Sequence, residues 1–260
     1  MMARMWSRTR ALRMAQRTPV ILLANAMLRA AGTLVFIFVG RISGPEDAGV
    51  LSLALGYLAI LTTLFTGLDD LLIREVTAAP KRVTALLLAY AVLRLPLTAL
   101  LSVVVLLIGQ AGSQLSPEQM LALRLIVSSA VLDALAGLGQ IVLYAFGGFR
   151  LLVLPAAVTL LLRAGVGPLL LLAGGFAPAA AMWPLSSVAG AALLLHSARR
   201  AIRDAGIEVQ RQPVDWSLVR HLGRLVPGFG AVSLLSALEY QLDVILLSKL
   251  RSPVDVGMYG

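Results

Sequence analysis

Long apolar segments alternate with short polar breaks along most of the chain, and this pattern predicts membrane-spanning helices. A helix needs about 20 apolar residues to cross the hydrocarbon core of a bilayer. The segments of this length are residues 19–40, 48–69, 84–109, 118–146, 151–173, 177–197 and 225–248. No segment alternates between apolar and polar residues for long enough to predict a transmembrane barrel. We therefore expect an all-α, polytopic membrane protein with about seven transmembrane helices.

Turn-forming residues mark the breaks between these segments. They are Gly44-Pro45, Pro80, Ser116-Pro117, Gly147-Gly148, Gly174-Gly175 and Pro213. Further prolines lie within the predicted spans, at positions 96, 155, 168, 184 and 227. Membrane helices tolerate internal prolines because neighbouring groups satisfy the backbone carbonyls that each proline leaves without a partner.

The break between the first two spans contains a motif that returns at the end of the chain. When residues 39–52 are aligned with residues 247–260, the matched pairs are Arg41 with Lys249, Pro45 with Pro253, Asp47 with Asp255, and Gly49 with Gly257. This repeated motif indicates that the helical unit that begins near residue 19 has a second copy, which begins near residue 225. The expected parts are a basic arm (1–18), a first lobe of six helices (19–197), a basic linker (198–224), and the first helix and outer loop of a second, incomplete lobe (225–260).

Composition supports membrane insertion. The chain is 59% apolar, has a mean hydropathy of +0.89, and carries only 13% charged residues, compared with about 25% in soluble domains. The absence of cysteine excludes disulfides and thiolate metal sites. His196 and His221 have no cluster of ligand-type residues nearby, and the sequence contains no phosphate-binding P-loop. We therefore expect no metal site, no cofactor and no enzymatic activity.

The positive charge is distributed asymmetrically across the predicted membrane. With a cytoplasmic N-terminus, fifteen Lys and Arg residues fall in cytoplasmic segments and three in outer loops. This bias predicts a multi-pass protein of the cytoplasmic membrane with its N-terminus inside. It also accounts for most of the net charge of +9, so we expect the lipid bilayer as a partner and no nucleic acid.

Charged residues inside the spans are the candidate functional residues, because a charge in a membrane needs a partner, a cavity or water. The basic ones near mid-depth are Arg29, Arg94 and Arg163, and the acidic ones are Asp133, Glu239 and Asp243. The excess of guanidinium groups favours a cationic cavity that binds an anion such as pyrophosphate. The carboxylates are candidates for charge pairing or for coupling to an ion gradient. The alternative is that these charges form buried pairs that only hold the helices together.

Asp69 and Asp70 close the second predicted span beside Arg74. We expect these three residues to form a solvated ion cluster at the cytoplasmic surface.

Three segments resemble the Wzx-type polysaccharide transport family, the O-antigen flippases of the multidrug/oligosaccharidyl-lipid/polysaccharide (MOP) exporter superfamily. They are the Arg41–Ser52 loop, Gly67-Leu68-Asp69 with Ile73-Arg74-Glu75, and the Leu225–Gly230, Tyr240–Leu247 and Val256–Tyr259 stretches. The resemblance implies two helical lobes around a central cavity and transport of a lipid-linked oligosaccharide to the outer leaflet. It also implies polysaccharide polymerase and export machinery as partners. Members have 12 to 14 helices, so the chain is expected to be truncated after the seventh.

Three other functions remain open at this stage. A cation-coupled multidrug exporter of the same superfamily is less favoured, because the first span carries Arg29 where a cation site would place a carboxylate. A membrane-embedded glycan enzyme is less favoured because every predicted outer loop is short. The third alternative is a truncated membrane protein that transports nothing.

Overall fold

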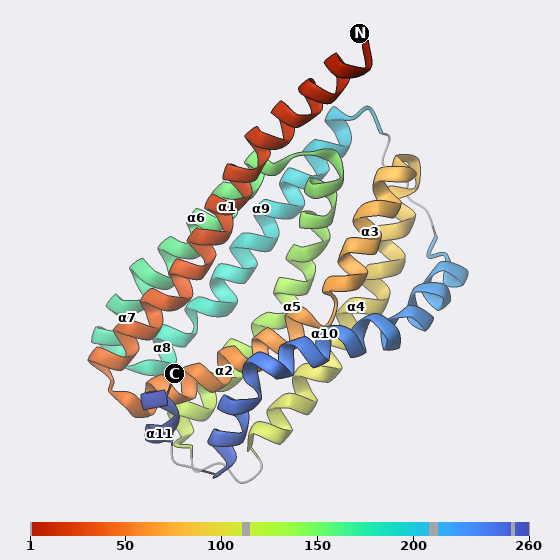
Figure 1. The fold of residues 1–260 in the computed structure, drawn as a ribbon. Coiled ribbons are helices and arrows are strands. Elements are labelled where there is room, and N and C mark those ends of the chain that lie inside the picture. The colour runs from red at the N-terminus through yellow and green to blue at the C-terminus, as the bar shows by residue number, and fades with distance from the viewer. Residues whose placement is uncertain (1, 111–114, 208–212, 251–252, 260) are drawn as a thin grey trace.

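The computed structural model describes residues 2–110, 115–207, 213–250 and 253–259, without the side chains of residues 2–17, 238, 240–244, 248–249, 253 and 258–259. The described chain is helical throughout, with no strand (Figure 1). The α-helices are α1 (Met2–Ile42), α2 (Pro45–Thr63), α3 (Thr66–Ala78), α4 (Val83–Gln110), α5 (Pro117–Phe146), α6 (Val153–Leu160), α7 (Gly167–Gly174), α8 (Phe176–Ala180), α9 (Met182–Asp204), α10 (Trp216–Leu250) and α11 (Pro253–Tyr259). Two 3₁₀ segments, η1 (Pro80–Arg82) and η2 (Phe149–Leu152), and one π-helical segment, η3 (Leu161–Val166), connect them.

Six helical segments of the described chain are long and apolar enough to cross a membrane, which confirms an all-helical fold of the polytopic membrane type. They are Thr18–Ile42, Pro45–Ala78, Pro80–Gln110, Pro117–Phe146, Phe149–Gly174 and Phe176–Asp204. The remaining predicted span, residues 225–248, falls inside α10, where several side chains lie outside the described residues. The total of seven spans therefore stays a prediction.

Local sequence determines where the helices begin and end. At the start of α5, the Gln119 amide donates to Ser116 Oγ at 3.2 Å, and the Ser116 amide donates back to Gln119 Oε1 at 3.0 Å. Pro117 occupies the first helical position, where a missing N–H costs nothing. Helix α5 ends at Gly147, whose φ of 74° is left-handed and suits glycine.

Asp215 caps α10 in the same way. Its Oδ1 accepts hydrogen bonds from the Ser217 hydroxyl at 2.6 Å, the Ser217 amide at 3.0 Å and the Leu218 amide at 3.2 Å. These bonds, above all the one from the Ser217 hydroxyl, hold the pKa of Asp215 below its usual value. The cap therefore keeps its charge at neutral pH and loses it only in acid.

Three of the five expected internal prolines fall in the first turns of shorter helices. Pro155, Pro168 and Pro184 lie within the first three residues of α6, α7 and α9. The predicted helix over residues 151–173 is one continuous helical span, Phe149–Gly174, which changes from α-helix in α6 to the π-helical η3 and back to α-helix in α7. Pro96 and Pro227 do lie inside α4 and α10, as expected.

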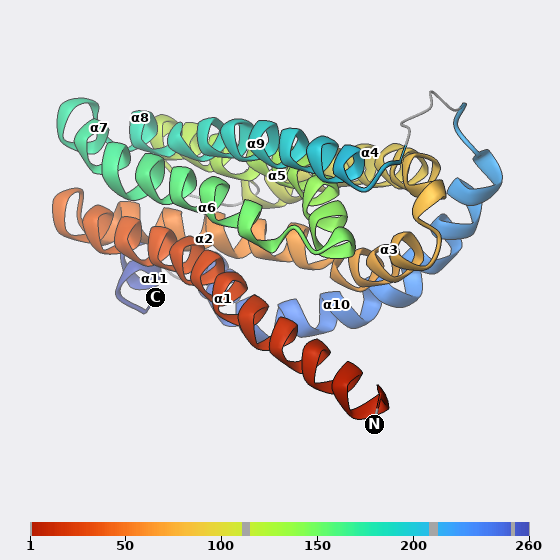
Figure 2. The same ribbon diagram turned by 90° about the horizontal axis from the view of Figure 1, so that it is seen from above.

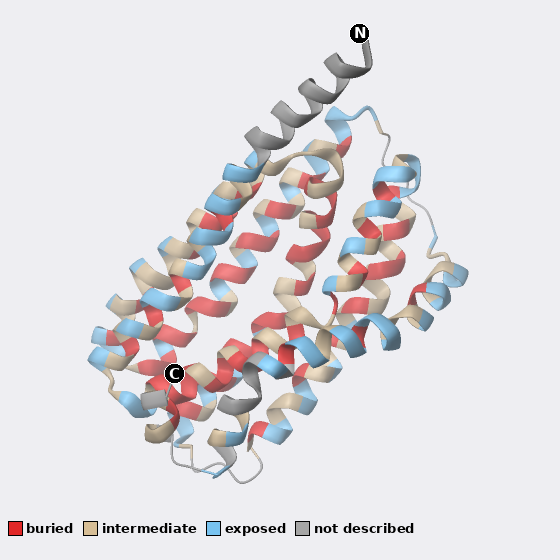
Figure 3. Cartoon of the chain, in the orientation of Figure 1, coloured by how far each residue is buried: buried red, intermediate tan, exposed pale blue. Residues whose placement is uncertain are grey.

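Helix α5 is the centre of the bundle. It packs against α9 on one side and against α4, α2 and α3 on the others. Helix α1 packs on α6 and α2, and α10 crosses the outer faces of α2, α3 and α4 (Figures 1 and 2). Buried residues concentrate on α5 and the neighbouring faces of α2 and α9 (Figure 3).

The apolar core is continuous at one end of the bundle and divided at the other. At the end where α1 turns into α2, one large cluster joins α1, α2, α5, α8 and the start of α9; Leu51, Leu123, Ile126 and Trp183 are almost fully buried in it. We call this cluster the closed end. Towards the opposite end the core consists of three clusters: one joins α3, α4, α5 and α10, a second joins α1, α5, α6 and α9, and a third joins α3, α4, α5 and α9.

The two copies of the repeated motif lie against each other. Helix α2 begins at Pro45 and α11 begins at Pro253, so each copy starts a helix at its proline. A side chain on Gly257 would collide with the backbone carbonyl of Pro45, so this glycine allows α11 to approach α2 closely. The motif therefore gives both copies the same helical start and a mutual contact.

The closest contact in the centre of the bundle generates a prediction. A Cβ on Gly139 would lie 2.8 Å from the backbone carbonyl carbon and oxygen of Leu194. Because backbone cannot rotate away, we expect Gly139→Ala to separate α5 from α9 and to cost about 1–3 kcal/mol, the usual cost of overpacking. Unfolding titrations in mixed micelles measure this change. Gly32→Ala is the matched control, because a Cβ there meets no atom within 4 Å; equal stability losses in both variants would contradict the packing argument.

Candidate functional site

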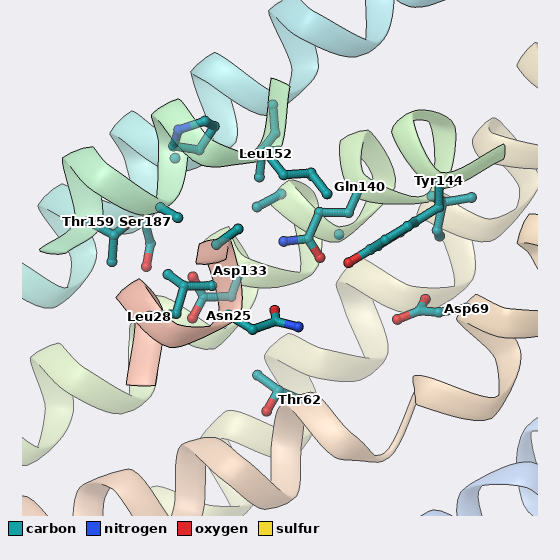
Figure 4. Close-up of a pocket in the computed structure, with 18 of the residues that line it drawn as sticks. Asn25, Leu28, Thr62, Asp69, Asp133, Gln140, Tyr144, Leu152, Thr159 and Ser187 are labelled. Atoms are coloured by element: carbon teal, nitrogen blue, oxygen red, sulfur yellow. The ribbon is translucent and has the colours of Figure 1, made fainter. Parts of the chain in front are cut away.

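A polar cavity lies between the apolar cluster on α3, α4, α5 and α10 and the cluster on α1, α5, α6 and α9. Its volume is about 540 Å³, and its walls come from α1, α2, α3, α4, α5, α6, η3 and α9 (Figure 4). Neutral polar side chains are numerous in its lining: Asn25, Thr62, Thr66, Gln140, Tyr144, Thr159 and Ser187 are among them. The charged residues of the lining are Asp69, Asp70, Asp133, Arg94 and Arg163. A lining of this kind is unusual within an apolar helical bundle, where polar groups are expensive.

Arg94, on α4, is bound tightly on the cavity wall. Its Nη1 donates to Asp69 Oδ1 on α3 at 2.5 Å, and the Tyr90 hydroxyl donates to the same oxygen at 2.6 Å. The guanidinium carbon also lies 5.3 Å from the centroid of the Phe65 ring and 5.5 Å from that of Tyr90, within cation–π range. The Arg94 side chain is only 6% exposed and that of Asp69 25%, so this ion pair neutralises a charge that would otherwise be buried alone.

A glycine on α5 makes room for this arginine. A Cβ on Gly137 would lie 2.9 Å from Nη1 and 3.2 Å from the guanidinium carbon of Arg94. The guanidinium therefore rests directly on the α5 backbone, and the pair links α3, α4 and α5. The buried Nε of Arg94 has no partner among the described residues.

Arg163 is held differently, on the π-helical segment. Its Nε donates to Ser186 Oγ at 2.7 Å and its Nη2 to Ser187 Oγ at 3.3 Å, both on α9. The guanidinium lies 5.2 Å from the centroid of the Trp183 ring. Two of its five N–H donors are used in these bonds, and others remain for a group inside the cavity. π-Helical segments occur frequently at functional sites.

Asp133, on α5, completes this side of the cavity. Its carboxylate lines the same cavity as Ser187 and Arg163, and the positive charges of Arg163 and, less strongly, of Arg94 attract it. Within the described residues, neither Asp133 nor Arg163 forms a direct ion pair. The opposite charges of Asp133 and Arg163 thus line one cavity without forming an ion pair.

The predicted site residues separate into three groups. Arg94, Arg163 and Asp133 line one cavity. Arg29 lies exposed on α1, outside that lining but one helical turn beyond Asn25, which belongs to it. Glu239 is exposed on α10 and also outside the lining, and the side chain of Asp243 lies outside the described residues.

The balance of charge differs from the sequence-based expectation. Three carboxylates and two guanidinium groups line the cavity, whereas a lining dominated by three arginines was expected. The pairing of Asp69 also differs, because it binds Arg94 and not Arg74. Predicting the second helix to end at residue 69 hid this pair; in the structure α3 continues to Ala78, which places Asp69 inside the bundle. The sequence did hold one signal of this pair: two residues of opposite charge, Asp69 and Arg94, lie in the consecutive predicted spans on either side of the Pro80 break.

In the part of the chain that the structure describes, no three His, Asp or Glu side chains gather in a way that could hold a metal ion. Comparison of the chain with models of known protein families, with curated proteins and with solved structures finds no match.

The Arg94–Asp69 pair generates a prediction with an internal control. Replacing Arg94 by Met or Asp69 by Asn leaves the other residue's charge without its partner, at a cost of about 3 kcal/mol for each single variant. The double variant should lose less than the sum of the two singles, with a coupling of about 1–3 kcal/mol. The matched pair is Arg200 and Asp204, whose side chains are 70% and 69% exposed; the same substitutions there should cost at most about 0.5 kcal/mol. Unfolding titrations in mixed micelles give both cycles, and additive losses at Arg94 and Asp69 would contradict the pairing.

Proposed function

We propose that this chain is the substrate-binding part of a transporter. Its substrate would be a lipid-linked oligosaccharide of the undecaprenyl-pyrophosphate type, moved across the cytoplasmic membrane for cell-surface polysaccharide synthesis. The observation that supports this most directly is a polar cavity of about 540 Å³ inside a bundle of membrane-type helices. The resemblance of three sequence segments to Wzx-type flippases supports the same class of substrate.

The distribution of packing supports transport rather than a purely structural role. The closed end is filled by one continuous apolar cluster, whereas the cavity divides the core towards the other end. A central site that is sealed on one side at a time is the general requirement for alternating access. With the orientation predicted from the positive charges, the closed end faces outward and the cavity lies in the cytoplasmic half.

The chemistry of the lining supports a glycan. Hydroxyl and amide groups such as those of Thr62, Gln140 and Thr159 both donate and accept hydrogen bonds, as sugar hydroxyls require. The lipid tail would stay in the bilayer beside the bundle. Arg29 is exposed on α1 at mid-span, and no carboxylate within the described part of the chain pairs with it. It is suited to bind the pyrophosphate at the rim of the cavity, where tail and glycan join.

One observation favours a second candidate, a cation-coupled multidrug exporter. Carboxylates outnumber guanidinium groups in the cavity lining, and Asp133 has no direct ion pair within the described structure. A carboxylate in that position suits the binding of a proton or a cation. The hydroxyl-rich lining and Arg29 favour the glycan, so the exporter is the second choice.

The role of Arg29 is tested by glycan export. In cells whose only copy of the gene carries Arg29→Ala, we expect surface glycan to fall about tenfold or more, because a hydrogen bond to a charged group contributes about 1.5–3 kcal/mol. Arg124→Ala is the control, since Arg124 is also exposed in a span but does not line the cavity. Normal surface glycan with Arg29→Ala at normal protein levels would remove Arg29 from the mechanism. A change in drug susceptibility without a change in glycan would favour the exporter.

A further inference from the structure

The two arginines that line the cavity differ in their contacts and in their access to a ligand. The charge of Arg94 is neutralised by a direct ion pair with Asp69, and its side chain packs between two aromatic rings and the Gly137 backbone with only 6% of its surface exposed, so a ligand in the cavity has little access to it. Arg163 is fixed in place by Ser186 and Ser187 but keeps further N–H donors. Ligand binding by a guanidinium group in this cavity therefore falls to Arg163.

Arg163 acts together with a carboxylate. Ser187 Oγ accepts a hydrogen bond from Arg163, and Asp133 lines the same cavity as these two residues. We call Arg163, Ser187 and Asp133 together the Arg163 relay. Ser186 makes the geometry more rigid, because it accepts from Arg163 Nε and donates to the Trp183 carbonyl at 2.9 Å. The relay presents fixed donors and fixed acceptors on one wall, and its two charges cancel.

A neutral donor–acceptor wall discriminates between ligands. A free phosphate that bound Arg163 would also lie within the field of the Asp133 carboxylate, which repels it. A sugar ring has no such conflict, because its hydroxyls can donate to Asp133 and accept from Arg163 at the same time. Figure 4 shows Thr159 beside Ser187, and Asn25 and Gln140 near Asp133, so further hydroxyl and amide groups surround the same space.

We infer that the Arg163 relay is a subsite for an uncharged sugar ring, with Asp133 as the hydroxyl acceptor and Arg163 as the donor, and that it does not hold the pyrophosphate. This inference rests on the proposed glycan function and assigns the recognition of the sugar to this wall. Asp133 then determines specificity through hydrogen bonding, rather than by serving as a counter-charge alone.

Direct binding to the purified chain tests the subsite. The chain is prepared in a detergent without a sugar headgroup and titrated with methyl glucoside, methyl galactoside and methyl mannoside, and separately with inorganic phosphate at constant ionic strength. Trp183 lies against Arg163, so its fluorescence reports binding once Trp6 and Trp216 are replaced by Phe. We expect at least one glycoside to bind saturably and more tightly than phosphate.

Two variants of the relay should respond in opposite ways to phosphate. Asp133→Asn removes the charge that repels phosphate, so glycoside binding should weaken about tenfold while phosphate binding strengthens by a similar factor. Ser187→Ala keeps both charges but removes a hydroxyl that holds the Arg163 guanidinium in place, so glycoside binding should weaken with no gain for phosphate. Asp204→Asn makes the same charge change at an exposed site on α9 and should alter neither titration.

The outcomes decide the inference. It is overturned if no glycoside binds saturably to the unaltered chain, if phosphate binds more tightly than every glycoside, or if Asp133→Asn leaves the preference unchanged. Because binding is measured without transport, its failure is distinct from failure of the proposed function. Loss of export with glycoside binding intact would instead indicate that the chain binds sugars without moving them.

Discussion

A charge buried among apolar helices must be neutralised where it lies, and Arg94 shows how this constraint organises the bundle. Its partner Asp69 comes from α3, its stacking partners Phe65 and Tyr90 from the start of α3 and from α4, and its support from Gly137 on α5. Removing water from both charges is costly, and the pair offsets this cost only with good geometry and further hydrogen bonds. The short bond to Asp69 and the second donor, Tyr90, provide them. Three helices are consequently fixed around one side of the cavity.

The opposite side of the cavity meets the same constraint without a direct ion pair. Arg163 is held by Ser186 and Ser187, and both Arg163 and Asp133 line the cavity. The contrast separates a structural charge pair from a pair that can bind a ligand. It also explains how a cavity with five charged residues can exist in the core: two of them are satisfied by the fold, and two by the relay, while Asp70 is exposed. The closed end, which one continuous apolar cluster fills, provides the seal.

Hydropathy and turn residues predicted much of this fold. The breaks at Gly44-Pro45, Pro80, Ser116-Pro117 and Gly147 all occur where expected, because glycine and proline act through local backbone geometry. The π-helical turn around Arg163 was not predictable, since no residue type specifies it alone. The sequence also placed Arg94 and Asp133 in the membrane without identifying their partners. Partner choice depends on the rotation and depth of each helix, and an error of nine residues at the end of α3 was enough to assign Asp69 to the surface.

We propose that the cavity admits water and solutes from the cytoplasmic side while the opposite end is sealed. The chain contains no cysteine, so single cysteines at Gln140, in the cavity, and at Leu123, in the closed end, can be labelled without background. The decisive measurement is the reaction of each with a membrane-impermeant maleimide added to one side of sealed membranes. Labelling of Gln140→Cys from the cytoplasmic side alone, with Leu123→Cys unreactive from both sides, is the predicted result. Labelling of Gln140→Cys only from the outer side, or from neither side, would contradict the account.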